Sequence, residues 1–116
     1  MPIQGMHALF YADQADELRL FLRDKLGLPA RDVGGGWLIN DFTTADMGVH
    51  PTDFPGAPPS GTTEVSFFCD DIEATMAELS GRGVAFEGPA QDQGFGIVAY
   101  FQMPAVGRVT LYQRKY

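Results

Sequence analysis

The sequence predicts an α+β fold in which one βαβββ unit occurs twice along a chain of 116 residues. Two observations support this prediction. Residues 64–86 repeat the pattern of residues 7–29, so that Phe67 matches Phe10 and Leu79 matches Leu22. In both halves, a segment with the composition of a strand precedes a segment whose apolar residues follow the helical period. A repeat of this length indicates a doubled module and has to be considered before any other fold.

The first half is expected to begin with a strand and a helix. Residues 3–11 carry β-branched and aromatic side chains, namely Ile3, Phe10 and Tyr11, and are expected to form a strand. Asp13 is placed to cap the helix that follows. Gly27 can adopt the left-handed conformation that ends a helix, and Pro29 prevents its continuation. The predicted apolar stripe of this helix is Ala15, Leu18, Leu22 and Leu26.

Three further strands are expected in the first half, at residues 31–33, 37–42 and 46–50. The glycines at residues 34–36 separate the first two and predict a hairpin turn. A run of glycines is also found in phosphate-binding loops, but here no helix follows that could present its amide groups to an anion. We therefore interpret this run as a turn.

Residues 51–62 contain closely spaced prolines and glycines and are expected to form a linker. The second half then repeats the order of the first. Asp70 and Asp71 provide an acidic N-cap for its helix. The expected elements are strands at residues 63–69, 84–86, 96–103 and 108–113 and a helix at residues 72–80. The chain is thus predicted to be one domain, with module one at residues 1–50 and module two at residues 63–116.

Composition excludes several classes of function. The formal net charge is −7, from 15 acidic and 8 basic residues, whereas nucleic acids and anionic membranes attract clustered Lys and Arg. No stretch is apolar and long enough to span a bilayer, and the N-terminus does not resemble a signal peptide. The single cysteine, Cys69, cannot form an internal disulfide and is expected to be a small core residue. These features predict a cytoplasmic protein.

Alternation along the strands separates two faces. The apolar set, Ala8, Phe10, Met47, Val49, Val65, Phe67, Val109 and Leu111, is expected to pack under the helices. The mixed set is His7, Leu9, Tyr11, Asp46, Gly48, His50, Glu64, Ser66, Phe68, Arg108, Thr110 and Tyr112. Aromatic side chains beside convergent polar groups are typical of a small-molecule cavity, although a solvent-exposed sheet face or a dimer surface would also be mixed.

The doubled pattern, the KLGLP end of the first helix, the DDIEATMAEL helix followed by RGVAF and the terminal GRVTLY strand together resemble the vicinal oxygen chelate superfamily. That superfamily includes glyoxalase I, extradiol dioxygenases and bleomycin-binding proteins. The resemblance implies two modules that form half-barrels around a cavity, often across a homodimer. It also implies metal ligands on the first and fourth strands of each module, which places His7, Gly48, Glu64 and Thr110 at those positions.

Of these four residues, His7 and Glu64 can bind a metal strongly. His50 lies two residues beyond Gly48 on the same strand face, so His7, His50 and Glu64 make a two-His, one-carboxylate set. Such a set suits Fe(II) and is acceptable to Zn, Ni or Mn. A His before proline at a strand end is also a common hydrogen-bonded terminus, so a protein without metal remains the alternative.

The resemblance and these residues predict a small-molecule protein, with three functions left open. The first is metal-assisted lyase or dioxygenase chemistry on vicinal oxygens, with His7 and Glu64 as catalytic residues. The second is a metal-free binding protein of the bleomycin-resistance kind that sequesters an aromatic or cationic compound. The third is an interaction module without activity. The expected ligand-binding residues are Tyr11, Trp37, Ser66, Phe68, Arg108, Thr110 and Tyr112.

Overall fold

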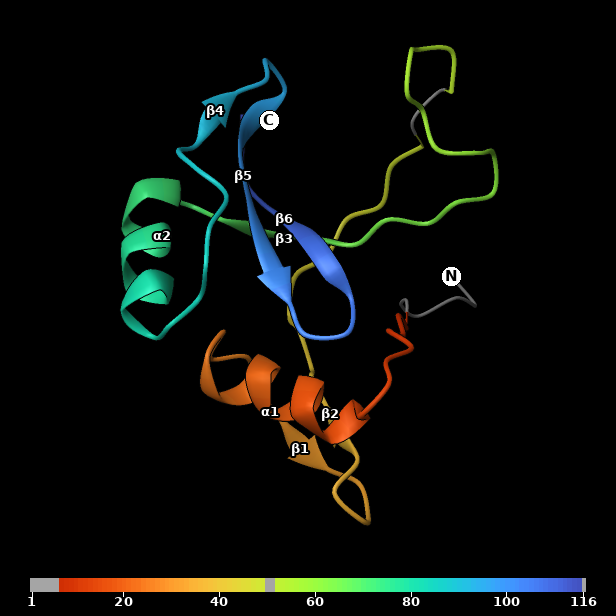
Figure 1. Cartoon of the computed structure of the whole chain (residues 1–116), viewed down its shortest axis with the longest axis vertical. Coiled ribbons are helices and arrows are strands. Elements are labelled where there is room, and N and C mark those ends of the chain that lie inside the picture. Colours follow the sequence, from red (N-terminus) through yellow and green to blue (C-terminus); the bar gives the residue numbers. More distant parts are fainter. Residues whose placement is uncertain (1–6, 50–51, 116) are drawn as a thin grey trace.

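A sheet built entirely from the second half of the chain is the framework of the molecule (Figure 1). The computed structural model describes residues 7–49 and 52–115. Within them, the four strands of this sheet lie in the order β3, β6, β5, β4, with β3 parallel to β6 and the other neighbours antiparallel. Their bounds are Ser66–Cys69 for β3, Gln91–Asp92 for β4, Gly96–Met103 for β5 and Gly107–Arg114 for β6.

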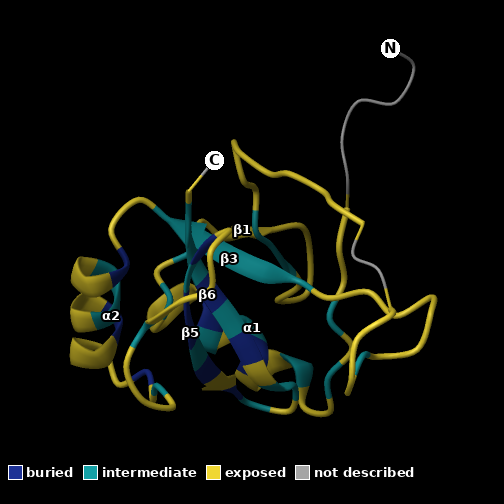
Figure 2. Ribbon diagram, turned by 90° about the horizontal axis from the view of Figure 1, so that it is seen from above, coloured by how far each residue is buried: buried dark blue, intermediate teal, exposed yellow. Residues whose placement is uncertain are grey.

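The helices α1 (Ala15–Asp24) and α2 (Ile72–Gly81) supply side chains to one core on one face of this sheet. In α2, the Asp71 carboxylate caps the N-terminus by accepting a hydrogen bond from the Ala74 N–H at 3.1 Å. Figure 2 shows the buried residues gathered where the helices meet the sheet. The buried core residues are Leu18, Leu22, Ile72, Leu79, Val84, Ala99, Phe101, Met103, Val109 and Leu111.

The first half forms α1 and a short hairpin. Gly27, at φ +71°, ends the helix turn, and the Leu28 N–H donates to the Leu22 carbonyl at 3.0 Å. The hairpin pairs β1 (Arg31–Asp32) antiparallel with β2 (Leu38–Ile39), and the glycines at residues 34–36 form its turn. The α+β fold class predicted from the sequence is thus confirmed.

Two predicted strands of the first half differ from the structure. Residues 7–11 and 46–49 belong to no strand, and the rest of those two predictions, residues 3–6 and His50, lies outside the described residues. Met47 and Val49 are 80% and 96% exposed, so the prediction that they pack under a helix is wrong. The reason is that a strand needs a neighbour to accept its hydrogen bonds, and no described strand of this chain pairs with these segments.

Smaller differences concern single residues. Asp13 does not cap α1, because Gln14 occupies the N-cap position in the left-handed region, at φ +52°, and no side chain caps the helix. The strand predicted at residues 84–86 is reduced to one bridge between Phe86 and Phe101. None of the helices in the described part of the chain is long and apolar enough to cross a bilayer.

Candidate functional site

The sheet face opposite the helices is the candidate binding site. The strand register fixes which side chains share this face, because residues directly paired across strands point the same way. One row across β5, β6 and β3 holds Val98, Tyr112 and Phe68, and the next holds Tyr100, Thr110 and Ser66. Arg108 lies beside Gln102 at one end of β6, and Arg114 lies beside Gly96 at the other.

Aromatic rings and guanidinium groups are stacked on this face. The rings of Phe68 and Tyr112 lie 6.0 Å apart and are tilted by 57°. The Arg114 guanidinium lies over Phe68, 3.9 Å from the ring centroid, and Arg108 lies over Tyr100 at 4.1 Å. Such contacts are attractive because the ring face carries negative charge density, and guanidinium groups stack well on rings.

Carboxylates lie beside both guanidinium groups. Arg108 contacts Glu87 at 3.2 Å, and the Gln102 amide donates a hydrogen bond to the same carboxylate at 2.6 Å. Arg114 contacts Asp46 at 3.4 Å. Since Asp46 belongs to the first half, this ion pair brings a residue of that half to the edge of the sheet face.

The structure brings together five of the predicted ligand-binding residues and separates two. Ser66, Phe68, Arg108, Thr110 and Tyr112 share the face described above, and all but Arg108 are half-buried. Trp37 lies on the β1–β2 hairpin beneath the Arg19 guanidinium, 4.8 Å from it, and Tyr11 is exposed on the segment that precedes α1.

Sequence analysis missed Tyr100, Gln102 and Glu87. The alternation that selected Arg108 and Thr110 on β6 also selects Tyr100 and Gln102 on β5, so the periodicity alone could have found them. Glu87 carries no such signal. It reaches this face because its N–H donates to the Tyr100 carbonyl at 2.9 Å, which aligns residue 87 beside β5.

Of the three predicted metal ligands, His7 and Glu64 lie among the described residues. Among residues 7–49 and 52–115, no three His, Cys, Asp or Glu side chains gather closely enough to hold a metal ion. His50 lies outside the described residues. Glu64 lines a cavity of about 560 Å³ together with Gly48 and residues of the linker. His7 is exposed and does not line this cavity.

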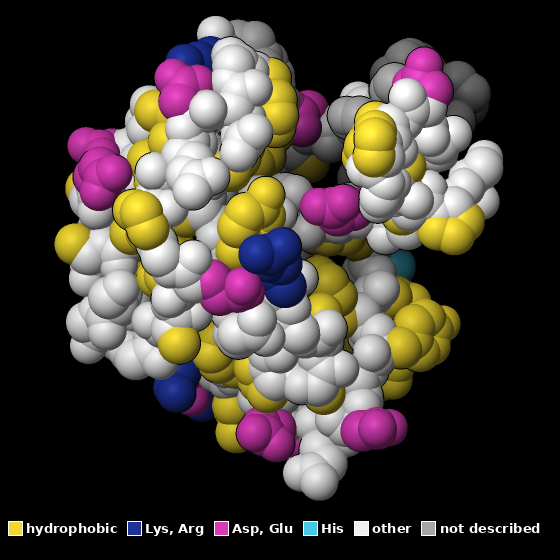
Figure 3. All heavy atoms as spheres, turned by 45° about the horizontal axis from the view of Figure 1, so that its top comes forward, with side chains coloured by type: hydrophobic (Ala, Val, Ile, Leu, Met, Phe, Trp, Pro, Cys, Tyr) yellow, Lys and Arg dark blue, Asp and Glu magenta, His cyan; other side chains and the backbone are white. Residues whose placement is uncertain are grey.

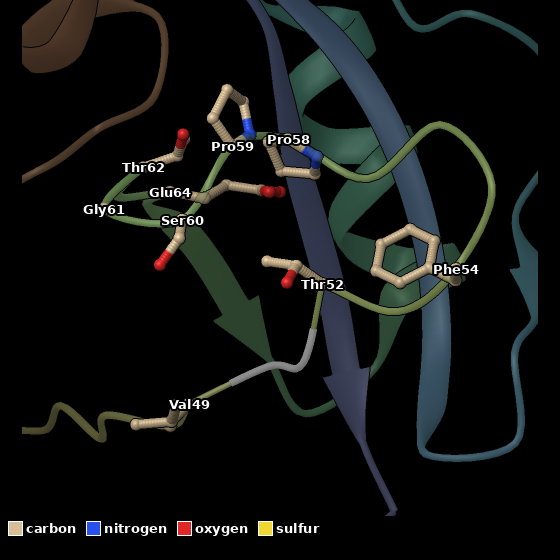
Figure 4. A pocket seen from close by; sticks show the side chains of 10 residues that line it. Val49, Thr52, Phe54, Pro58, Pro59, Ser60, Gly61, Thr62 and Glu64 are labelled. Atoms are coloured by element: carbon tan, nitrogen blue, oxygen red, sulfur yellow. The ribbon is translucent and has the colours of Figure 1, made fainter.

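This cavity lies between the linker and the end of the first half, where Gly48 and Val49 line it. Figure 4 shows the Glu64 side chain reaching toward Pro58, with Thr52 nearby. In the space-filling view, the linker stands apart from the body of the molecule with a hollow beside it (Figure 3). Its described walls hold one carboxylate and otherwise hydroxyl, proline, glycine and apolar residues, so they do not by themselves fit a metal ion.

Cys69 faces the helix side of the sheet, as predicted. It lines a small apolar cavity of about 180 Å³ between β3, α2 and the chain that follows α1. Burial raises the pKa of the Cys69 thiol above its usual value of 9.0. A thiol with a raised pKa carries little thiolate at neutral pH, so Cys69 is not an activated nucleophile.

Comparison with known proteins agrees with this architecture. Residues 6–107 match the family model described as the Glyoxalase/Bleomycin resistance protein/Dioxygenase superfamily. The chain belongs to this superfamily. A search of curated protein sequences found no match.

Solved structures of the superfamily cover nearly the whole chain. TnmS3, an antibiotic binding protein from Streptomyces sp. CB03234, is 28% identical, with 90% of this chain and 89% of that chain covered and a TM-score of 0.61. A glyoxalase/bleomycin resistance protein from the same organism is 30% identical over 88% and 92% of the two chains, with a TM-score of 0.55. A lactoylglutathione lyase from Agrobacterium tumefaciens, 18% identical over 97% and 96% with a TM-score of 0.61, shares the fold.

Proposed function

We propose that this protein binds and sequesters an aromatic small molecule without chemically changing it. The observation that carries the proposal is the sheet face opposite the helices, where three aromatic rings, two guanidinium groups and two hydroxyl side chains stand side by side. Small-molecule sites combine apolar and aromatic walls with a few placed polar groups, and this face has that composition. The likeness to an antibiotic binding protein supports the same function.

Thr110 also favours binding over catalysis. The family resemblance puts a metal-ligating carboxylate at this position of the last strand, and here a neutral hydroxyl lies between Arg108 and Tyr112 on β6. A hydroxyl can donate and accept hydrogen bonds, so Thr110 can orient a ligand oxygen. In this proposal Ser66 and Thr110 supply the hydrogen bonds, and Phe68, Tyr100 and Tyr112 supply the stacking surface.

A second copy of the chain is part of the proposal. Large apolar side chains are exposed on the first half, and the segments at residues 7–11 and 46–49, which have a strand-like sequence pattern, pair with no strand of the described chain. A segment with a strand pattern and unpaired backbone groups can pair with another chain. A homodimer would cover them and wall the open sheet face. Analytical ultracentrifugation should therefore show a dimer, and Val49→Asp should shift it toward monomer, whereas a monomeric wild-type protein would contradict this part.

Binding is tested with a neutral aromatic probe, 2-naphthylmethanol, followed by calorimetric titration. Phe68→Ala should raise the Kd about 5- to 10-fold, because an aromatic stacking contact contributes about 1 kcal/mol beyond area burial. Phe95→Ala is the matched control, since Phe95 is exposed on the turn between β4 and β5. No binding of the probe, or equal losses in both variants, would contradict a ligand site on this face.

Metal-assisted chemistry is the second candidate. It is favoured by the position of Glu64, which lines a cavity beside Gly48 where the first module ends. A divalent metal bound by His7, His50 and Glu64 would act as a Lewis acid on adjacent ligand oxygens. The described side chains do not make such a site alone, so we derive no catalytic step from it.

The metal content of protein purified without tag or chelator separates the two candidates. A near-stoichiometric metal that is lost in both His7→Ala and His50→Ala would favour catalysis. Asp53→Asn, which removes a charge from the linker without removing a proposed ligand, is the control. No bound metal after incubation with Fe, Zn, Ni or Mn would favour binding alone.

A further inference from the structure

We infer that the ligand is a planar aromatic anion and that Arg108 recognises its anionic oxygen. This inference rests on the proposed function and adds to it the charge of the ligand and the residue that selects it.

Arg108 lies at the end of a row of ligand-facing side chains. It is followed on the same face of β6 by Thr110 and Tyr112, which at the usual strand rise are about 7 and 13 Å away along the strand. A two-ring aromatic compound over Thr110 and Tyr112 would therefore place a substituent at the Arg108 guanidinium. The guanidinium is planar and carries five N–H donors, a shape that suits a carboxylate.

The ring of Tyr100 holds this guanidinium in place. The stacked distance of 4.1 Å keeps one face of Arg108 on the ring, while the side chain as a whole is 59% exposed. An orienting contact of this kind reduces the side-chain entropy lost when a ligand binds. Within the described chain, Arg108 makes one ion pair, to Glu87 at 3.2 Å.

The contact with Glu87 can be exchanged for a ligand anion. Exposed ion pairs of this type contribute about 0.2–1 kcal/mol, so little is lost when Arg108 turns toward another carboxylate. Glu87 keeps a strong partner in that case, because the Gln102 amide donates to it at 2.6 Å. A ligand anion can therefore take the place of Glu87 at the Arg108 guanidinium, and Glu87 then remains hydrogen-bonded to Gln102.

A cationic ligand fits this face less well, although the net charge of −7 attracts cations in general. A ligand cation binds best over an aromatic ring. The guanidinium groups of Arg108 and Arg114 already lie over one face of the Tyr100 ring and one face of the Phe68 ring. A second cation would meet these positive groups at close range, whereas an anion would be attracted by them.

Three probes of one shape test the inference: 2-naphthoate, neutral 2-naphthylmethanol and cationic 2-naphthylmethylamine, each titrated calorimetrically at neutral pH. We expect 2-naphthoate to bind most tightly. Arg108→Gln should raise its Kd about 10- to 100-fold, as for a lost charge-assisted hydrogen bond, and should raise the Kd of 2-naphthylmethanol by less than about 3-fold. Arg108→Lys should recover part of the loss. Arg82→Gln, an exposed arginine of the α2 terminus paired with Glu78, is the control.

Glu87→Gln gives an effect of opposite sign. Removing the competing carboxylate should lower the Kd of 2-naphthoate about 1.5- to 5-fold, the worth of an exposed ion pair. Equal binding of the three probes, tightest binding of the amine, or an Arg108→Gln loss shared by 2-naphthylmethanol would overturn the inference and leave aromatic binding standing. No binding of any probe would overturn both.

Discussion

The two halves of this chain share one sequence pattern and reach different structures. The second half forms a four-stranded sheet with α2 packed on it, among the residues that the structure describes. The first half forms α1 and a hairpin of two short strands, and contributes only Leu18 and Leu22 to the buried core there. Among the described residues, Phe95 is the exposed large apolar side chain of the second half, whereas the first half has Leu9, Tyr11, Leu20, Val33, Trp37, Phe42, Met47 and Val49.

The difference shows what a strand pattern leaves open. In the second half, β3 finds its neighbour β6 in the same chain. The corresponding segment of the first half, residues 7–11, has the same alternation and no described partner strand. Periodicity determines which side chains share a face, but a strand forms only where a neighbour accepts its hydrogen bonds. The four predictions below test the contrast between the halves.

The largest contrast is expected between Phe101→Ala and Val49→Ala. Phe101 is 1% exposed and packs against Phe67 and Phe86, so its truncation should lower the free energy of unfolding by about 3–5 kcal/mol. Val49→Ala should change it by less than about 0.5 kcal/mol in dilute protein, because Val49 is solvent-exposed. Urea unfolding measures both. An equal loss at every protein concentration would remove the contrast between the halves.

Glycine positions give the second contrast. A Cβ at Gly96 would lie 2.7 Å from the Gln113 carbonyl oxygen, which is backbone of the neighbouring strand and cannot move easily. Gly96→Ala should therefore destabilise the protein by about 1–3 kcal/mol. Gly48→Ala is the counterpart in the first half, where a Cβ meets nothing within 4 Å. In chemical denaturation, Gly48→Ala should leave the free energy of unfolding nearly unchanged. A Gly96→Ala variant as stable as the wild type would contradict the close approach of β5 and β6.

Helix capping gives the third contrast between the halves. Asp71→Ala removes the side chain that accepts the Ala74 N–H, and should lower the free energy of unfolding by about 1 kcal/mol. Asp13→Ala changes the acidic residue just before the Gln14 N-cap of α1, and should have little effect because no side chain caps that helix. Thermal unfolding followed by circular dichroism compares the two variants. A loss for Asp13→Ala as large as that for Asp71→Ala would show that α1 is capped by an acidic side chain as α2 is, and would contradict the contrast.

The smallest effect concerns acid stability. The Lys115 ammonium and the Gly94 N–H lower the pKa of Asp92 below its usual value of 3.8, and Arg31 similarly lowers the pKa of Asp41. A carboxyl with a lowered folded-state pKa stabilises the protein above its unfolded-state pKa, and this stabilisation is lost as the pH falls through the folded-state value. Asp92→Asn and Asp41→Asn should each flatten the fall in Tm below about pH 4.

The two substitutions should flatten the fall in Tm at low pH by different amounts. Asp92 has a backbone hydrogen bond in addition to its cation, so Asp92→Asn is expected to give the greater flattening. Asp53→Asn removes the same charge from the linker and serves as the control. A Tm profile for Asp92→Asn that matches the wild type at every pH would show that the contact with Lys115 does not form in solution.

The sequence predicted those parts of the fold that depend on local signals. The strand predicted at residues 96–103 is β5, and the helix predicted at residues 72–80 is α2 extended by one residue. Gly27 ends the first helix as expected, because only a left-handed residue suits that position. The strands expected at residues 3–11 and 46–50 depend on distant partners that no local pattern identifies. The boundaries of the two modules and the linker stay predictions.

The candidate site was predictable to the same extent. Alternation placed Ser66, Phe68, Thr110 and Tyr112 on one face without any knowledge of the sheet, and the register confirms that they share it. The cluster around Glu87 was missed because it depends on how residue 87 aligns beside β5. In the set of His7, His50 and Glu64, family resemblance selected His7 and Glu64, and strand alternation selected His50. This set stays a prediction because its geometry depends on segments that no local signal positions.

The parallel pairing of β3 with β6 also governs the order in which the site is assembled. β5 and β6 are joined by a short turn and can pair early, since closing a small loop loses little chain entropy. β3 is separated from β6 by α2, β4 and β5, so its docking waits for a distant contact and is expected late in folding. Phe68 then meets Tyr112 only at that step. A folding intermediate in which β3 has not yet docked would be compact around the β5–β6 hairpin but could not bind a ligand. The appearance of ligand binding during refolding would therefore mark the docking of β3.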